Sequence, residues 1–301
     1  MGLELLINLD QGKVSVLSKF SKATKSLTVA ACSVLLTGCS FSFVYNHLDW
    51  WANWYLDDYV TLNKTQQKAF DEVFNELHVW HRETQLPIYA EQLKQLKADL
   101  AAGITEEKAK EHLGKTNEYW IVVREKAKTD LIELTHMLSE KQRKELLANL
   151  DKQNQERIEN REELSREEWV KEECKEQQSQ FKSWVGKLSK SQKADICEAT
   201  GELQSTFNHW MDYRMAWHNS FTDALDVSLS KEEYVALFAE LISEPEKLRS
   251  DEYLSLREQN NRVFVGLFAE VMNGLSQKQT NRLNNKIDDF IEDIEDLAQD
   301  S

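Results

Sequence analysis

The stretch Leu188-Ser189-Lys190-Ser191-Gln192 places an apolar residue, a hydroxyl and a glutamine at the spacing of a helix start. In a capping box, the N-cap hydroxyl accepts from the backbone three residues later, and the glutamine side chain accepts from the N-cap backbone. The same pattern recurs at 62–66, 138–142 and 275–279, with Asn63 as the cap in the first of these. Four repeats of one start signal divide the chain into helices joined by short loops.

Further starts and stops follow from the same local chemistry. Related N-cap signals occur at Thr105, Ser165, Ser230 and Ser243. Three glycines lie just upstream of predicted starts, where we expect left-handed C-caps, namely Gly103, Gly186 and Gly274. We therefore expect helical hairpins with tight turns.

The predicted helices carry apolar stripes at steps of three and four residues. Trp120 and Leu131 fall on such a stripe within 105–136, and Trp210 and Trp217 on another within 189–225. Only 9 Gly and 2 Pro interrupt 301 residues. The predicted fold class is all-α: elongated antiparallel helical hairpins packed as a bundle with short capped loops.

The N-terminal segment indicates secretion rather than folding. Leu36-Thr37-Gly38-Cys39 closes a short apolar run and resembles the lipobox of bacterial lipoproteins. We predict that 1–38 is a lipoprotein signal peptide, that an acyl lipid such as palmitate is attached to Cys39, and that 39–301 is one helical domain. The apolar run is too short to span a membrane. An uncut signal anchor and a soluble protein with an apolar N-terminal helix are the alternatives.

The segment 151–180 differs from the rest because apolar residues are sparse among its charges. We predict a polar helical arm there, with a linker as the alternative.

Several motifs together resemble a known family. Tyr45-Asn46-His47-Leu48-Asp49-Trp50-Trp51, then Trp80-His81-Arg82 and Trp184-Val185-Gly186-Lys187-Leu188, are similar to a family of bacterial lipoproteins classed only as a domain of unknown function. The resemblance implies a lipid anchor and a helical fold, and it supplies no catalytic residues. Ser40 follows Cys39 in place of the aspartate that is associated with inner-membrane retention in enteric bacteria. Similarity to that sorting rule implies an outer-membrane protein that faces the periplasm. The leucine, hydroxyl and glutamine repeat also resembles that of small periplasmic stress chaperones.

Charge and motif content argue against several functions. The formal net charge of -15 repels nucleic acid, so we expect no nucleic-acid partner. His78 and His81 have a helical spacing that can ligate a metal, but no cysteine or third histidine lies near them in the sequence. We expect no catalytic site, no bound metal and no cofactor.

An aromatic cluster follows the anchor directly. Trp50, Trp51, Trp54 and Tyr55 crowd one short predicted helix. Tryptophan and tyrosine prefer the boundary between membrane and water, so the cluster could contact the membrane surface. The alternative is an inward stripe that seals the base of the bundle.

Four ionisable residues fall on apolar stripes and predict a polar core. We expect Asp58 to accept hydrogen bonds from Arg124 or Arg214, with His81 nearby, because a buried charge must be paired. Such a network either fixes helix register or forms a pocket for an anionic or zwitterionic ligand.

Cys174 and Cys197 lie almost symmetrically about Gly186, the predicted turn of a hairpin. We predict a disulfide across that hairpin, with two buried thiols as the alternative.

Together these features predict a lipid-anchored envelope protein, most simply in the outer membrane, that acts as a binding or scaffolding module. Its partners would be the membrane, through the lipid on Cys39, and another envelope protein. The alternative is a periplasmic chaperone-like or small-ligand-binding module with a polar pocket in an aromatic core.

Overall fold

The computed structural model describes residues 39–161 and 163–299. The predicted signal peptide, 1–38, lies outside the described residues. Within them the structure is helical and contains no strand, which confirms the all-α fold class. The helices are α3 (Cys39–Asn46), α4 (Leu48–Asp57), α5 (Lys64–Thr84), α6 (Leu86–Ala102), α7 (Glu106–His136), α8 (Glu140–Glu159), α9 (Arg166–Val185), α10 (Lys190–Glu202), α11 (Phe207–Ala224), α12 (Lys231–Ser243), the 3₁₀ helix η2 (Pro245–Leu248), α13 (Asp251–Asn273) and α14 (Gln277–Gln299).

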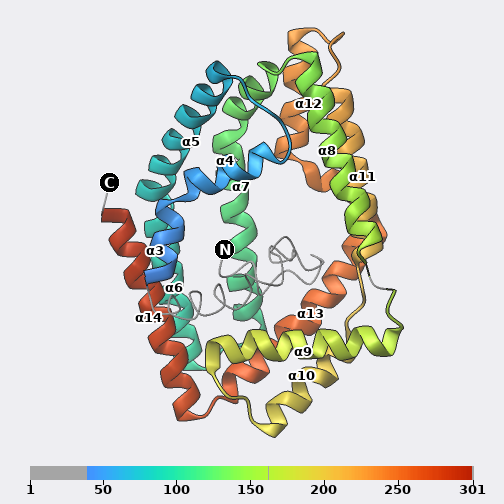
Figure 1. Ribbon diagram of the computed structural model, residues 1–301. Helices are drawn as coiled ribbons and strands as arrows, with labels where there is room; N and C mark the ends of the chain where they lie inside the picture. Colours follow the sequence, from blue (N-terminus) through green and yellow to red (C-terminus); the bar gives the residue numbers. More distant parts are fainter. Residues whose placement is uncertain (1–38, 162, 300–301) are drawn as a thin grey trace, which may run out of the picture.

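The helices form two groups on opposite sides of the molecule, and α7, α9, α10 and α13 connect them (Figure 1). On one side α6 packs against α5 and α14, and α3 packs on α14; on the other, α11 packs against α8 and α12. The α9–α10 hairpin contacts α14 and α13, while the long α7 packs against α5, α12 and α13. A large core lies where α6, α9, α13 and α14 meet, and a second lies among α7, α8, α11 and α12.

Local capping explains where most helices begin. Capping boxes with both hydrogen bonds open α5, α8, α9, α10 and α12, at Asn63, Ser139, Ser165, Ser189 and Ser230. Gly103 and Gly186 adopt the predicted positive φ, 88° and 83°. Gly274 does not, since its φ is -91°. The cap predicted at Ser243 is also wrong, because this residue ends α12.

The four glutamine motifs pair two by two in space. The Gln66 and Gln142 side chains donate to each other's oxygen over 3.0 and 2.7 Å, and each also donates to the carbonyl preceding the other's leucine. Gln192 and Gln279 repeat this arrangement in full. Each pair of glutamines joins two helix starts by hydrogen bonds, so the repeated motif has a structural role in this protein.

One long predicted helix is broken in the structure. The helix expected over 189–225 ends at Glu202 and resumes at Phe207. The buried Asn260 amide of α13 accepts from the Gln204 N–H over 2.9 Å and donates to its carbonyl over 2.7 Å. These two hydrogen bonds satisfy the Gln204 backbone groups, which a continuous helix would pair within itself.

The apolar stripe predicted on α7 is only partly correct. Trp120 and Leu131 are exposed, because Arg124, Ala127 and Ile132 face the neighbouring helices instead.

The segment 151–180 comprises the end of α8, a turn and most of α9. Its Asn154, Cys174 and Gln177 side chains are buried, and α9 packs along α10 and α14.

Candidate functional site

Helix α4 has no buried residue and carries a cluster of exposed aromatic rings. We call its exposed rings, with one from α3, the aromatic surface: Phe43 at 62% exposure, Trp50 at 56%, Trp51 at 40%, Trp54 at 43% and Tyr55 at 57%. The three indoles touch edge to face in sequence. The interpretation of an inward stripe is therefore wrong, since the rings face solvent rather than the bundle.

Polar contacts hold both ends of this segment to the body. At one end, the buried Tyr45 hydroxyl lies 2.9 Å from His81 Nδ1, and the Tyr89 hydroxyl lies 3.3 Å from His81 Nε2. At the other end, the Tyr59 hydroxyl donates to Gln153 on α8 over 2.7 Å. Helix α4 thus crosses between the two groups of helices, as Figure 1 shows.

Burial perturbs the pKa values of the groups that hold α3. Burial, and then the charge of His78, lowers the pKa of His81 to about 4. Burial raises the pKa values of Tyr45 and Tyr89 to about 12. At neutral pH the contact is therefore made by a neutral imidazole between two phenols.

The predicted polar network does not form around Asp58. This residue is exposed at the end of α4, so its carboxylate is not directed into the core. Arg124 is buried as predicted, but it donates to Glu246 over 2.9 Å and to the Ser243 carbonyl over 2.7 Å. Burial alone would raise the pKa of Glu246, but hydrogen bonds, chiefly from Arg124, and the charge of Arg124 lower it.

Arg214 has its own partner in the second group of helices. Its Nε and Nη2 donate to the Oδ1 atom of the buried Asn154 over 3.0 and 2.9 Å, and its guanidinium lies 5.0 Å from the Trp210 ring centre. The four predicted residues, Asp58, His81, Arg124 and Arg214, therefore occupy separate places and form no common pocket.

The two cysteines of the α9–α10 hairpin are joined in this structure. Cys174 and Cys197 form a disulfide with Cα atoms 4.9 Å apart, within the usual reach of the bond. The Gln178 amide donates to both sulfur atoms.

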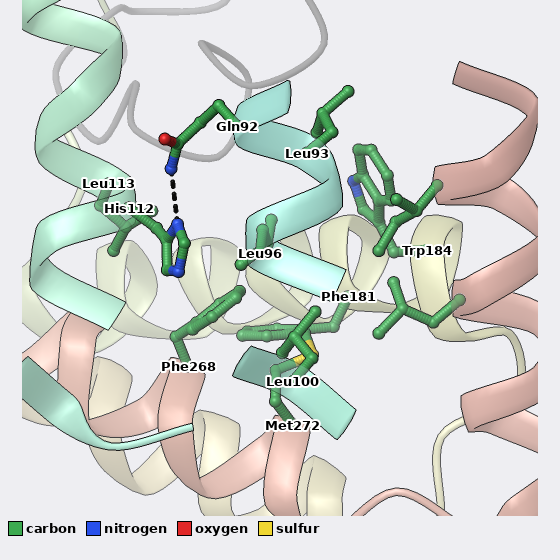
Figure 2. Close-up of a pocket in the computed structure, with 12 residues that line it drawn as sticks. Gln92, Leu93, Leu96, Leu100, His112, Leu113, Phe181, Trp184, Phe268 and Met272 are labelled. Carbon is green, nitrogen blue, oxygen red and sulfur yellow. Dashed lines mark hydrogen bonds between the residues drawn. The ribbon is translucent and has the colours of Figure 1, made fainter. Parts of the chain in front are cut away.

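A pocket that the sequence did not indicate lies between α6, α7, α9, α13 and α14 (Figure 2). Leucines from α6, the Phe181 and Trp184 rings, and Phe268 and Met272 form most of its wall. His112 and Gln92 are its polar members. The periodicity of each helix could not reveal the pocket, because each helix contributes only a few residues to it.

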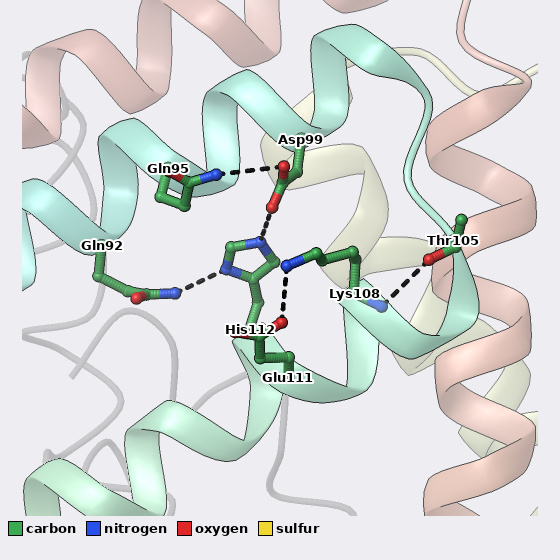
Figure 3. A network of polar contacts seen from close by, with 7 residues as sticks. All are labelled: Gln92, Gln95, Asp99, Thr105, Lys108, Glu111 and His112. Carbon is green, nitrogen blue, oxygen red and sulfur yellow. Dashed lines mark hydrogen bonds and ion pairs between the residues drawn. The ribbon is translucent and has the colours of Figure 1, made fainter.

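His112 is locked in place by α6, as Figure 3 shows. Its Nδ1 lies 2.6 Å from the Gln92 amide nitrogen, and its Nε2 lies 2.8 Å from the Asp99 carboxylate. The hydrogen bond from His112 lowers the pKa of Asp99. Because an amide nitrogen donates and a carboxylate accepts, both ring nitrogens are satisfied in one neutral tautomer.

Two further properties concern membranes and metals. Over 39–161 and 163–299, no helix combines the length and the apolar character needed to cross a bilayer. In the same part of the chain, no group of three or more histidine, cysteine and acidic side chains could hold a metal ion. For His78, which was considered as a metal ligand, the Nε2 atom is buried without a hydrogen-bond partner.

Comparison with known proteins identifies the family. Residues 58–254 match DUF6279, a family of unknown function, and since this range exceeds half of the chain, the protein belongs to that family. The predicted resemblance to a domain of unknown function is thereby confirmed. No curated protein and no solved structure matches the chain. The whole of the aromatic helix α4 and the C-terminal α14 lie outside the matched range.

Proposed function

We propose that this protein is a lipid-anchored binding or scaffolding module of the bacterial envelope, held against the membrane surface by α4. The observation that carries the proposal is the aromatic surface, which begins four residues after Cys39. We place the anchor in the outer membrane, with the helical body facing the periplasm. Another envelope protein would then bind the body, away from α4.

The chemistry of α4 fits the membrane boundary. Indole and phenol rings combine an apolar body with a polar group, and they concentrate at the level of the lipid head groups. A helix on the surface adds affinity to a lipid anchor and fixes the orientation of the body. Helix α4 contains Asp49 and Asp57 but no lysine or arginine. Its attraction to lipid is therefore apolar and insensitive to salt, unlike that of a basic helix.

Flotation with vesicles tests the surface separately from the lipid. The full chain with Cys39→Ser is mixed with phosphatidylcholine vesicles, and we expect a fraction to float with them. Substitution of Trp50, Trp51 and Trp54 by alanine should abolish flotation. Trp120→Ala is the matched control, because this indole is 55% exposed but lies on α7. Equal flotation of the triple variant and the control would contradict the proposal.

Labelling tests the anchor itself. Cells grown with radioactive palmitate should label the wild-type chain and leave Cys39→Ala unlabelled, because no other acceptor is proposed. Label retained by Cys39→Ala would refute the lipid attachment, whatever the flotation result.

A further inference from the structure

Three arginines lie together where the end of α8 meets α11, and we call them the arginine cluster: Arg157, Arg161 and Arg214. The Arg157 and Arg214 guanidiniums lie 5.7 and 5.0 Å from the ring centre of Trp210. The Arg161 guanidinium lies 3.8 Å from the ring centre of Phe207, on the same helix as Trp210. Guanidinium groups stack on aromatic faces, so the rings hold these cations in place without neutralising them.

The cluster has no carboxylate partner, although the whole chain has a net charge of -15. Within the part of the chain that the structure describes, none of the three arginines forms an ion pair. Two lysines of the same helix α8 differ, since Lys144 pairs with Glu140 and Lys152 pairs with Glu156. The C-terminus of α8 supplies only about half of a negative charge. Most of the positive charge of the cluster therefore remains uncompensated.

Much of the hydrogen-bonding capacity of the cluster is also free. Arg157 makes no hydrogen bond to the described residues, and Arg161 makes one, from its Nη2 to the Ser205 hydroxyl over 3.2 Å. Arg214 uses its Nε and Nη2 on Asn154, which leaves Nη1. Arg157 and Arg161 are partly exposed, so a ligand can reach them. Guanidinium groups bind phosphate oxygens through paired N–H donors.

The guanidiniums also repel each other. Burial, and then the charge of Arg157, lowers the pKa of Arg214. Two cations at one indole raise the free energy of the folded protein, and an anion bound beside them would offset this cost.

The arginine cluster borders the aromatic surface at Tyr55. The Tyr55 hydroxyl lies 2.7 Å from the Tyr59 hydroxyl, which donates to Gln153 on α8 over 2.7 Å. Arg157 follows Gln153 by about one helical turn. Burial, and then the hydrogen bond with Tyr55, raises the pKa of Tyr59, whereas the nearby charge of Arg157 acts in the opposite direction. Figure 1 shows α4 reaching the side of the molecule that α8 and α11 form.

We infer that the arginine cluster binds the phosphate of an anionic phospholipid in the membrane that α4 contacts. Rings at the head-group level and cations beside them match the two parts of a lipid surface, its apolar boundary and its phosphates. The inference rests on the proposed membrane contact of α4, and it adds a lipid class to that proposal. In phosphatidylcholine the choline group compensates the phosphate, whereas in phosphatidylglycerol the negative charge is left for the arginines. The apolar attraction of α4 is common to both lipids.

Vesicle flotation over a range of lipid concentrations tests the inference on the full chain with Cys39→Ser. Vesicles of pure phosphatidylcholine are compared with vesicles that also contain phosphatidylglycerol. Arg157→Gln should weaken binding to the phosphatidylglycerol vesicles about fivefold, the effect of one basic residue at an anionic surface, and leave binding to phosphatidylcholine unchanged. Arg157→Lys keeps the charge and should retain most of the affinity.

Lys286→Gln is the matched control, because it removes a positive charge that also lies over a ring and has no ion pair among the described residues. The Lys286 ammonium is 4.5 Å from the ring centre of Trp184, but it belongs to α14, in the other group of helices. This variant should bind both kinds of vesicle as the parent does. Equal weakening by Lys286→Gln and Arg157→Gln would overturn the inference. Arg161→Gln serves as the test variant if Arg157→Gln melts at a lower temperature.

Inorganic phosphate separates a lipid head group from a free anion. At equal ionic strength, we expect phosphate and chloride to give the same melting temperature, because α4 supplies no affinity for a free ion. A higher melting temperature in phosphate for the parent but not for Arg157→Gln, together with equal flotation of the two proteins, would overturn the lipid assignment in favour of a free phosphate.

The failure of this inference can be distinguished from the failure of the membrane contact of α4. If the parent floats with neither kind of vesicle, the membrane contact is refuted and the lipid assignment with it. If the parent floats with phosphatidylcholine, but the parent and Arg157→Gln bind phosphatidylglycerol vesicles equally, only the inference about the arginine cluster is overturned. Equal weakening of Arg157→Gln on both kinds of vesicle would overturn the choice of an anionic lipid.

Discussion

Helices α4 and α11 are both rich in aromatic residues, but the rings of α4 are exposed, whereas those of α11 are buried or partly buried. In α11, Trp210 and Phe221 are 8% and 7% exposed, whereas Trp50 and Tyr55 of α4 are 56% and 57% exposed. The difference lies in the neighbours. Helix α11 packs against α8, α12 and α13, while α4 lies beside α3 and α5 and leaves its remaining faces open. Aromatic content therefore does not determine burial, and the rings of α4 remain available for a partner.

The largest difference should appear in stability. Trp210→Ala in α11 should lower the free energy of unfolding by about 3–5 kcal/mol, because it opens a cavity in a packed core. Trp50→Ala in α4 should change it by less than about 0.5 kcal/mol, since the ring is exposed. Urea unfolding followed by circular dichroism measures both. Comparable losses in the two variants would mean that α4 is a core element.

A second test removes the covalent support of the hairpin that precedes α11 and leaves α4 unchanged. Replacing Cys174 and Cys197 by alanine should lower the free energy of unfolding by about 3 kcal/mol, as expected for a loop of this length. Mass spectrometry of protein from the native envelope checks the bond itself. Two thiols that react with an alkylating agent before reduction would contradict the disulfide.

The third test concerns the buried polar contact between Arg214 of α11 and Asn154 of α8. Arg214→Leu should cost about 2 kcal/mol, because the buried Asn154 oxygen loses its donor. Replacing both residues by leucine should recover much of this loss, since no polar group is then left without a partner. Thermal melts of the single and double variants measure the difference. A neutral single variant would mean that water replaces the guanidinium.

The fourth and smallest effect concerns the attachment of α3. The pKa of His81 is about 4 in the folded protein and 6.5 in the unfolded chain, so the unfolded chain binds the proton first as pH falls. The stabilisation is complete above pH 6.5 and is lost as pH falls to 4. Because the ring is partly exposed, we expect about 1–2 kcal/mol.

The matched variant for this titration is His81→Gln, which keeps a polar side chain but does not titrate. Its melting temperature should fall less than that of the wild type between pH 7 and pH 4. Parallel curves for the two proteins would show that His81 does not titrate in this range.

The helix starts could be predicted because their chemistry is local. At Ser139 and Gln142, both hydrogen bonds of the capping box join residues three apart, so the sequence contains both partners. The break after Glu202 could not be predicted in this way. Its cause, the Asn260 side chain, is 56 residues away from Gln204 and acts only after α13 has packed.

In the candidate sites, too, contacts between residues far apart in the sequence could not be predicted. Helical periodicity predicted that Arg124 is buried, but not that its partner is Glu246, 122 residues away. For α4, rings occur on several sides of the helix, so periodicity could not distinguish an inward face from an open one. The pocket beside His112 is lined by residues of five helices, and no single segment carries its signature.

Quenching by brominated lipid measures directly whether the α4 indoles lie at a membrane. Tryptophan fluorescence of the full chain with Cys39→Ser should decrease on vesicles whose phosphatidylcholine carries bromine near the head group. Changing Trp50, Trp51 and Trp54 to phenylalanine should keep vesicle flotation but remove most of the quenching, because the fluorescent rings at the boundary are gone. Quenching of the same size in this triple variant would place other tryptophans at the membrane and contradict the proposed membrane contact of α4.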